Sequence, residues 1–324
     1  RSRIHVFIST SQIHREQMLR MSEQDVLDAI TESVTRARRY ADDVEFSPQD
    51  ATRTHPDFVI ESCRRAVAAG ATTINIPDTV GYAVPSDFVA LMERVYGEVR
   101  GGNDDVIIST HCHNDLGLAV ANSLSAIHAG ARQIEGAING LGERAGNTST
   151  EEIIMAVKTR EDYFGVEVGA DTTEIFDTSR LVARLTGYPI QYNKAIVGRN
   201  AFAHESGIHQ HGVLRHPETY EIMDPSAIGH ASALVLGKHS GRAAFADALS
   251  KMDITLEDED FKRAFDRFKE LADRKGEISE EGIRAIVSEK TGVVTDTMEL
   301  VGIHFSGGNQ EVPVAAVTVR RNGD

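Results

Sequence analysis

The sequence has 324 residues, of which 41% are hydrophobic and 26% are charged, and its formal net charge is −15. This acidic balance argues against general affinity for nucleic acids or anionic membranes. The sequence has no run of 18 apolar residues, which argues against a transmembrane helix. Two cysteines, Cys63 and Cys112, are too few for a disulfide framework, so we expect a reducing, cytoplasmic compartment.

Short apolar runs alternate with helical patterns along the first half of the sequence. Strands are predicted over residues 4–8, 44–46, 73–76, 106–110 and 133–138. The first two helices are predicted to begin after Ser22 and at Pro56, and the next three to cover residues 85–99, 116–129 and 150–159. The strands recur about every 30 residues, the size of one βα unit, which predicts an α/β fold with a parallel sheet. A TIM barrel needs eight such units, so we expect a partial barrel made of the last five units, with three units absent from the front.

The pattern changes after residue 160. Helices are predicted over residues 171–186, 241–251, 257–275 and 279–290, and the stretch between the first two is rich in Gly, His and Asn. Residues 298–305 and 312–320 alternate like a hairpin. We therefore predict a catalytic barrel part over residues 1–165, helical linker or lid subdomains over residues 166–292, and the start of a further domain over residues 293–324.

The clearest chemical signal is a pair of histidines at the end of the fourth predicted strand. His111 and His113 are two residues apart, so their side chains leave the same face of a strand. Two imidazoles placed in this way can bind one divalent cation, with oxygen ligands completing the shell. The alternative is one partly buried histidine and one solvated histidine, and the position at a βα loop favours the metal.

Two further segments have an ambiguous pattern. Residues 140–147 form a glycine-rich loop that suits a phosphate or a thioester, or is a tight βα turn, and they lack nucleotide-binding spacings. Residues 204–212 contain three histidines, which are compatible with a second metal site, with proton transfer or with a polar loop. Cys63 falls on the apolar stripe of a helix, and Cys112 is predicted to point away from the two histidines.

Long stretches of the sequence resemble the family of 2-isopropylmalate, homocitrate and citramalate synthases, and most closely its leucine-pathway members. The matching stretches are residues 3–11, 44–47, 74–82, 111–118, 139–147 and 202–212. The resemblance implies a TIM barrel followed by helical subdomains and a C-terminal regulatory domain. It also implies a transferase that condenses acetyl-CoA with 2-oxoisovalerate (3-methyl-2-oxobutanoate) to give 2-isopropylmalate, with a divalent metal such as Mn²⁺, Mg²⁺ or Zn²⁺. A homodimer is the oligomeric state to expect.

The resemblance also assigns roles to individual residues. It makes His111, His113 and Asn147 the metal ligands, and it places His5, Ser47 and Thr79 around the 2-oxo acid. It makes His209 and Tyr220 the groups that assist proton transfer. The acyl-CoA loop would contain Gly142, Glu143, Arg144 and Gly146.

Two departures from the family pattern affect these expectations. No Arg-Asp-Gly motif, which supplies a metal-binding Asp in relatives, occurs at the start of this sequence, and Gln49 replaces a Glu found in many relatives. We therefore expect the 324-residue chain alone to be inactive. Citramalate synthase acting on pyruvate is the nearest alternative function, followed by homocitrate synthase, a lyase on the same barrel, and a non-catalytic fragment.

Overall fold

The computed structural model describes residues 2–202, 216–230, 236–237, 240–275, 277–278, 280–291, 298–308 and 311–321. The chain divides into two compact units, one formed by Arg1–Phe202 with Ile222–Ala231 and the other by Ala203–Glu221 with Ser232–Asp324. The three-part division predicted from the sequence stays a prediction.

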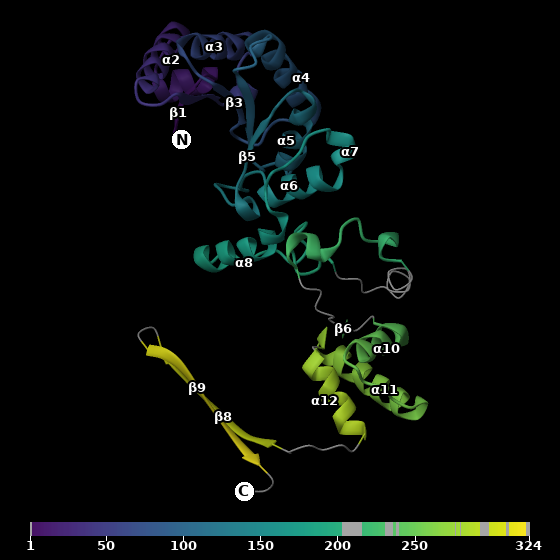
Figure 1. Ribbon diagram of the computed structural model, residues 1–324. Coiled ribbons are helices and arrows are strands. Elements are labelled where there is room, and N and C mark those ends of the chain that lie inside the picture. Colours follow the sequence, from purple (N-terminus) through teal and green to yellow (C-terminus); the bar gives the residue numbers. More distant parts are fainter. Residues whose placement is uncertain are drawn as a thin grey trace. The chain divides into compact units, whose positions relative to one another are not determined.

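The first unit contains a parallel sheet of five strands in the order β1-β2-β3-β4-β5. The strands are β1 (Arg3–Ser9), β2 (Asp43–Gln49), β3 (Thr73–Asp78), β4 (Ile107–Cys112) and β5 (Gln133–Glu135). Each strand is followed by at least one helix, and Figure 1 shows α2 to α5 gathered along one side of the sheet. The predicted α/β fold with five parallel βα units is confirmed.

Five helices follow the strands of this sheet. They are α2 (Glu23–Arg38), α3 (Pro56–Ala69), α4 (Pro85–Val95), α5 (Ala119–His128) and α6 (Thr150–Thr159). Ser22 caps α2 as expected: its hydroxyl accepts from the Asp25 amide, and the Asp25 carboxylate accepts from the Ser22 amide. A short helix, α7 (Glu161–Phe164), and the longer α8 (Ile175–Thr186) come next.

Three predicted boundaries were wrong. The α-helix predicted to end at residue 99 ends at Val95 and continues as one π-helical turn, Tyr96–Arg100. The helix predicted from residue 116 begins at Ala119, because the Asn114 side chain accepts from the Ala119 amide and a turn occupies the preceding residues. β5 is only three residues long, because the chain after Glu135 pairs with residues 148–150, where the Ala137 amide donates to the Thr148 carbonyl at 2.9 Å.

The helices cover one face of the sheet, which we call the outer face; the opposite face is the inner face. Side chains alternate along each strand, so residues of one parity pack under the helices. The outer face and the helices share one hydrophobic core, whose strand members include Val44, Phe46, Ile74, Ile76 and Ile108. Cys63 and Cys112 are buried in the same core, as the sequence predicts.

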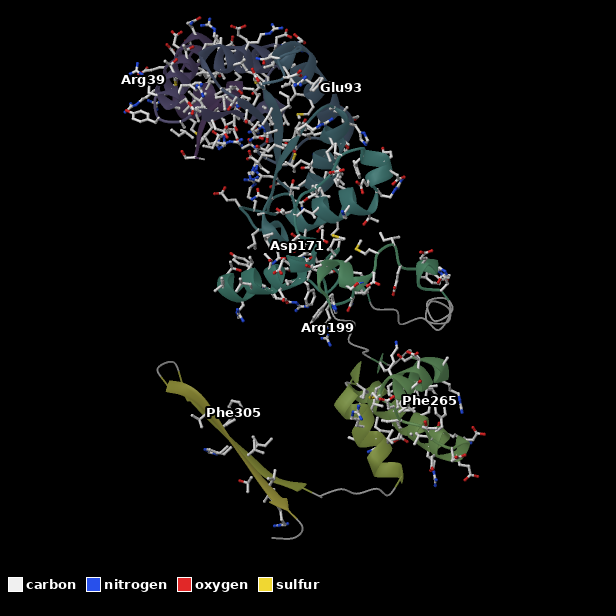
Figure 2. All side chains as sticks on the ribbon, viewed as in Figure 1. Arg39, Glu93, Asp171, Arg199, Phe265 and Phe305 are labelled. Carbon is white, nitrogen blue, oxygen red and sulfur yellow. The ribbon has the colours of Figure 1, made fainter. Side chains whose placement is uncertain are left out.

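The second unit has its own helical core and a separate hairpin. Helices α10 (Arg242–Lys251), α11 (Asp258–Lys275) and α12 (Glu280–Thr291) accompany the short strands β6 (Leu236–Gly237) and β7 (Glu277–Ile278). Phe245 and Phe268 stack in their core with ring centroids 5.0 Å apart, and Phe265 lies on α11 (Figure 2). The predicted hairpin is confirmed as β8 (Met298–Gly308) paired with β9 (Glu311–Arg321).

The hairpin exposes large apolar side chains, among them Phe305 on β8, which is 73% exposed (Figure 2). Among the residues that the structure describes, no helix is both long enough and apolar enough to cross a membrane.

Candidate metal and substrate site

The inner face of the sheet is polar, although the interior of a TIM barrel is usually filled with branched apolar side chains. Residues of the opposite parity to the core point to this face, and register places them side by side: His5 beside Glu45, Asn75 beside Ser109, and His111 beside Glu135. A sheet that carries its core on one face and these groups on the other is suited to hold a site on the polar face.

His111 and His113 converge on one point of this face. Their Nε2 atoms are 3.4 Å apart, and the ring centroids are 5.0 Å apart with an interplanar angle of 80°. Burial, together with the neighbouring His113, lowers the pKa of His111 to about 4. The His111 imidazole is therefore neutral at physiological pH, which is the form that binds metals.

Asn147 lies beside this pair through a β-bridge to His113. Its Nδ2 donates to the Leu141 carbonyl at 2.9 Å, and its Oδ1 is buried without a hydrogen-bond partner among the described residues. Two imidazole nitrogens and an unpaired amide oxygen are a donor set that fits a divalent cation such as Zn²⁺ or Mn²⁺. Within the described part of the chain, no group of three or more His, Cys, Asp or Glu residues is arranged to hold a metal.

The loop after β5 packs on itself and thereby places Asn147. The Asn147 amide donates to the Gly140 carbonyl at 3.0 Å, and the Gly146 amide donates to the Glu143 carbonyl at 2.9 Å. A Cβ on Gly146, where φ is 91°, would lie 2.0 Å from the Gly140 oxygen, and a Cβ on Gly142 would lie 2.5 Å from Asn147 Nδ2. The glycines are therefore required for the close approach of the loop to itself.

Arg144, also in this loop, is held at the rim of the site by hydrogen bonds to protein groups. Its guanidinium binds both carboxylate oxygens of Asp115, at 2.8 and 2.9 Å, and donates to the Thr79 carbonyl at 2.9 Å. Its Nη2 also lies 3.0 Å from His113 Nδ1, which contacts the same Thr79 carbonyl. The hydrogen bonds from Arg144 hold the pKa of the Asp115 carboxyl below its usual value. Arg144 thus connects the loop to His113 and to the end of β3.

A cavity of about 170 Å³ opens on the inner face next to the histidines. Its lining contains five of the residues predicted for the site, His5, Ser47, Thr79, His111 and His113. His5 Nε2 and Ser47 Oγ are 2.7 Å apart, and the Thr79 hydroxyl accepts from the Asp50 amide at 2.9 Å. A larger cavity of about 330 Å³ lies by α5 and α6 and contains none of the predicted residues.

The 170 Å³ cavity is also lined by residues that the sequence interpretation missed. These are Phe7, Asn75, Pro77 and Glu135; Gln49, which the sequence shows as a departure from the family pattern, also lines the cavity. Their signal was available, since each alternates with the outer-face residues of its strand.

Glu135 is paired with Glu45 from β2. Burial, with the Glu45 carboxylate beside it, raises the pKa of Glu135 to about 8. Arg3 donates to Glu45 at 2.8 Å, and Gln133 donates to both carboxylates at 3.1 Å. Gln133 therefore links the two carboxyl groups in one network on the inner face.

The remaining predicted residues do not line the cavity. His209 and the histidine-rich stretch 204–212 lie outside the described residues. Tyr220 belongs to the second unit and is 44% exposed. Gly142, Glu143, Arg144 and Gly146 lie together in the loop that presents Asn147.

Two family models match the chain. The HMGL-like model covers residues 1–182, and the homocitrate synthase post-HMGL domain-like model covers residues 196–276. The first match contains the whole sheet and every ligand candidate described above.

Curated relatives match nearly the whole chain. The 2-isopropylmalate synthase of Acidimicrobium ferrooxidans is 56% identical over 99% of this chain and 62% of its own length. Those of Pelotomaculum thermopropionicum and Chromobacterium violaceum are each 53% identical, over 99% and 100% of this chain and 64% of their own lengths. The chain therefore spans somewhat less than two thirds of the relatives that it matches.

Solved structures share the fold at low sequence identity. An HMG-CoA lyase from Acinetobacter baumannii, in complex with coenzyme A and 3-methylmalate, matches with a TM-score of 0.52 and 22% identity, covering 62% of this chain and 67% of that one. Hydroxymethylglutaryl-CoA lyase from Pseudomonas aeruginosa matches with a TM-score of 0.51 and 20% identity, covering 58% and 64%. These likenesses support the barrel architecture.

Proposed function

Because the chain belongs to the HMGL-like family, whose model covers more than half of it, we propose that the protein is a 2-isopropylmalate synthase. The observation that carries the proposal is the 53–56% identity to curated enzymes of that name over almost the entire chain. The proposed reaction joins acetyl-CoA, 2-oxoisovalerate and water to give 2-isopropylmalate and free coenzyme A. It is the first committed step of leucine biosynthesis.

We assign the metal to His111 and His113 through Nε2 and to Asn147 through Oδ1. The convergence of the two nitrogens and the unpaired buried oxygen support this donor set. When bound there, a divalent cation supplies Lewis-acid polarisation of the keto group of the 2-oxo acid. Mn²⁺, Mg²⁺ and Zn²⁺ are the candidates, and the two nitrogen ligands favour Mn²⁺ or Zn²⁺ over Mg²⁺.

The 2-oxo acid is placed in the 170 Å³ cavity. Ser47 and Thr79 offer hydroxyl donors for its carboxylate, and His5, 2.7 Å from Ser47 Oγ, orients that hydroxyl. The ring of Phe7 and the pyrrolidine of Pro77 give the cavity apolar surface beside these donors, which suits a branched aliphatic substituent.

Acetyl-CoA is placed against the loop that contains Gly142, Glu143, Arg144 and Gly146. Arg144 serves there chiefly to hold the loop on Asp115 and Thr79, since its Nε and Nη2 already donate to these two residues. His209 and Tyr220 are assigned to proton transfer, with His209 moving a proton at an imidazole nitrogen and Tyr220 at its hydroxyl. We further propose that the enzyme is a cytoplasmic homodimer.

The test is a coupled measurement of thiol release and product identity with the full-length protein. Acetyl-CoA is supplied with 2-oxoisovalerate, pyruvate or 2-oxoglutarate, after chelation and after return of Mn²⁺, Mg²⁺ or Zn²⁺. We expect the highest kcat/KM for 2-oxoisovalerate, with 2-isopropylmalate as product, and no turnover after chelation. A higher kcat/KM for pyruvate would reassign the protein to citramalate synthesis, and cleavage of an acyl-CoA without condensation would reassign it to a lyase.

A further inference from the structure

One ring nitrogen of His111, Nδ1, has no hydrogen-bond partner in the described part of the chain that would explain the orientation of the ring. Its Nδ1 is buried and makes no hydrogen bond within the described residues, whereas its Nε2 faces His113. A neutral imidazole carries one proton, so binding a cation through Nε2 places that proton on Nδ1. A buried Nδ1–H needs an acceptor.

The carboxylate of Glu135 faces this nitrogen. Its Oε2 lies 3.6 Å from His111 Nδ1, and the two residues are register partners on neighbouring strands. Side chains of register partners leave the sheet on the same face, so the carboxylate is held beside the ring by the backbone pairing itself. A small rotation of either side chain brings the atoms within hydrogen-bond distance.

Glu135 is itself oriented by neighbours on the inner face. Gln133 Nε2 donates to its Oε1 at 3.1 Å, and Asn75 Nδ2 donates to its Oε2 at 3.4 Å. The Ser109 hydroxyl lies 3.5 Å from Oε1. A carboxyl group held by donors from β3, β4 and β5 is a rigid support for a neighbouring ring.

We propose that Glu135 is a positioning residue for the metal site: it accepts the Nδ1 proton of His111, and so fixes the tautomer and the angle of that ring. The proposal rests on the assignment of His111 as a metal ligand. Carboxylates that accept from the second nitrogen of a metal-binding histidine orient the ring and strengthen it as a ligand.

The second histidine supplies an internal contrast. His113 Nδ1 contacts the main-chain carbonyl of Thr79, so the backbone orients that ring. The Thr79 carbonyl belongs to the main chain, so no side-chain substitution removes that support of His113. The support of His111 by Glu135 can be removed by a single side-chain substitution that leaves the ligand in place.

The experiment measures binding of Co²⁺ to the full-length protein by calorimetry and by its visible d–d absorption. In Glu135→Ala we expect Co²⁺ affinity to fall about 10–100-fold and the d–d bands to shift. Glu135→Gln keeps an acceptor oxygen but cannot ionise, so its Co²⁺ affinity should fall between those of Glu135→Ala and the wild type. The matched control is Glu61→Gln, the same change in a residue that pairs with Arg65 on α3, away from the inner face, and it should leave Co²⁺ affinity at the wild-type value.

The outcomes separate this inference from the proposed function. His111→Ala should abolish Co²⁺ binding at this site; if it does not, the ligand assignment fails. If His111→Ala abolishes binding while both Glu135 variants keep wild-type affinity and d–d bands, the positioning role is overturned and the metal site stands. If Glu135→Ala does not fold, Glu135→Gln decides, because it conserves volume. An affinity loss in Glu61→Gln as large as in Glu135→Gln would also overturn the proposal, since it would point to general charge loss.

Discussion

The two faces of the five-stranded sheet are made by the same strands and have opposite chemistry. On the outer face, residues such as Phe46, Ile74 and Ile76 are fully buried under the helices. On the inner face, the histidines and glutamates form a hydrogen-bonded network around a cavity. One face therefore supplies the hydrophobic free energy of folding, and the other contains groups that would be costly to bury without partners. The following predictions test whether stability and chemistry are separated in this way.

The largest effect is expected on the inner face. His111→Ala in the full-length protein should lower kcat/KM by about 10³-fold or more, because the cation supplies several kcal/mol of transition-state stabilisation. The unfolding midpoint should change little. His128→Ala is the matched control: this histidine is on α5, stacked on Phe164 away from the sheet's inner face, and its loss should leave turnover close to wild type. Equal losses in the two variants would contradict the separation of the faces.

On the outer face the effect should be on stability. Ile76 is completely buried in the core, so Ile76→Ala should lower the free energy of unfolding by about 2–5 kcal/mol, measured by urea titration. Ile76→Val, which removes one methyl group, should cost about 0.5–1.5 kcal/mol. At temperatures where both variants are folded, we expect wild-type Co²⁺ affinity. Unchanged stability with weakened metal binding would mean that the faces are not independent.

Alanine substitutions in the turns that lead from the outer helices into β3 and β5 should lower stability less than Ile76→Ala does. The two turns should also differ in the size of this loss. Gly70 and Gly130 both have φ above 100°, at equivalent points of a short repeat, so alanine at either should cost about 1–3 kcal/mol in backbone strain. A Cβ at Gly130 would lie 2.2 Å from the Tyr96 ring, whereas a Cβ at Gly70 would meet the flexible Arg38 side chain. Thermal unfolding should therefore rank Gly130→Ala below Gly70→Ala; the reverse order would show that the Tyr96 ring moves freely.

The smallest expected effect concerns the Cys63 thiol, which should not react with thiol reagents in the folded protein. Cys63 is fully buried in the outer-face core, and burial raises the pKa of its thiol. In the native protein a disulfide reagent should therefore modify it only as fast as the core opens. Ile76→Ala should accelerate that modification, and urea should make it immediate. Rapid modification of Cys63 in the folded wild type would show that this core is less closed than its burial indicates.

Much of the sheet and part of the site were predictable from local patterns. The βα repeat, the Ser22 cap and the facing pair His111 and His113 depend only on alternation, capping chemistry and spacing, which act over a few residues. The position of β5's end was not predictable, because the residues after Glu135 pair with residues 148–150 beyond the loop. The left-handed conformation of Asn139 was not predictable either. The partners of that residue come from a distant helix: its Oδ1 accepts from the Ser179 hydroxyl on α8, and its Nδ2 donates to the Ser179 carbonyl at 3.0 Å.

By itself, the sequence determined which residues face which side of each strand, since that alternation is a property of the extended backbone. It also determined the two-histidine pattern and, through long matching stretches, the family. Only the tertiary structure decided which inner-face groups meet. Gln133 reaches Glu45, 88 positions earlier in the chain, and Glu135 comes to lie beside His111, because parallel register sets the neighbours of each side chain. Register depends on how all five strands and their helices pack together, and no local stretch of sequence contains that information.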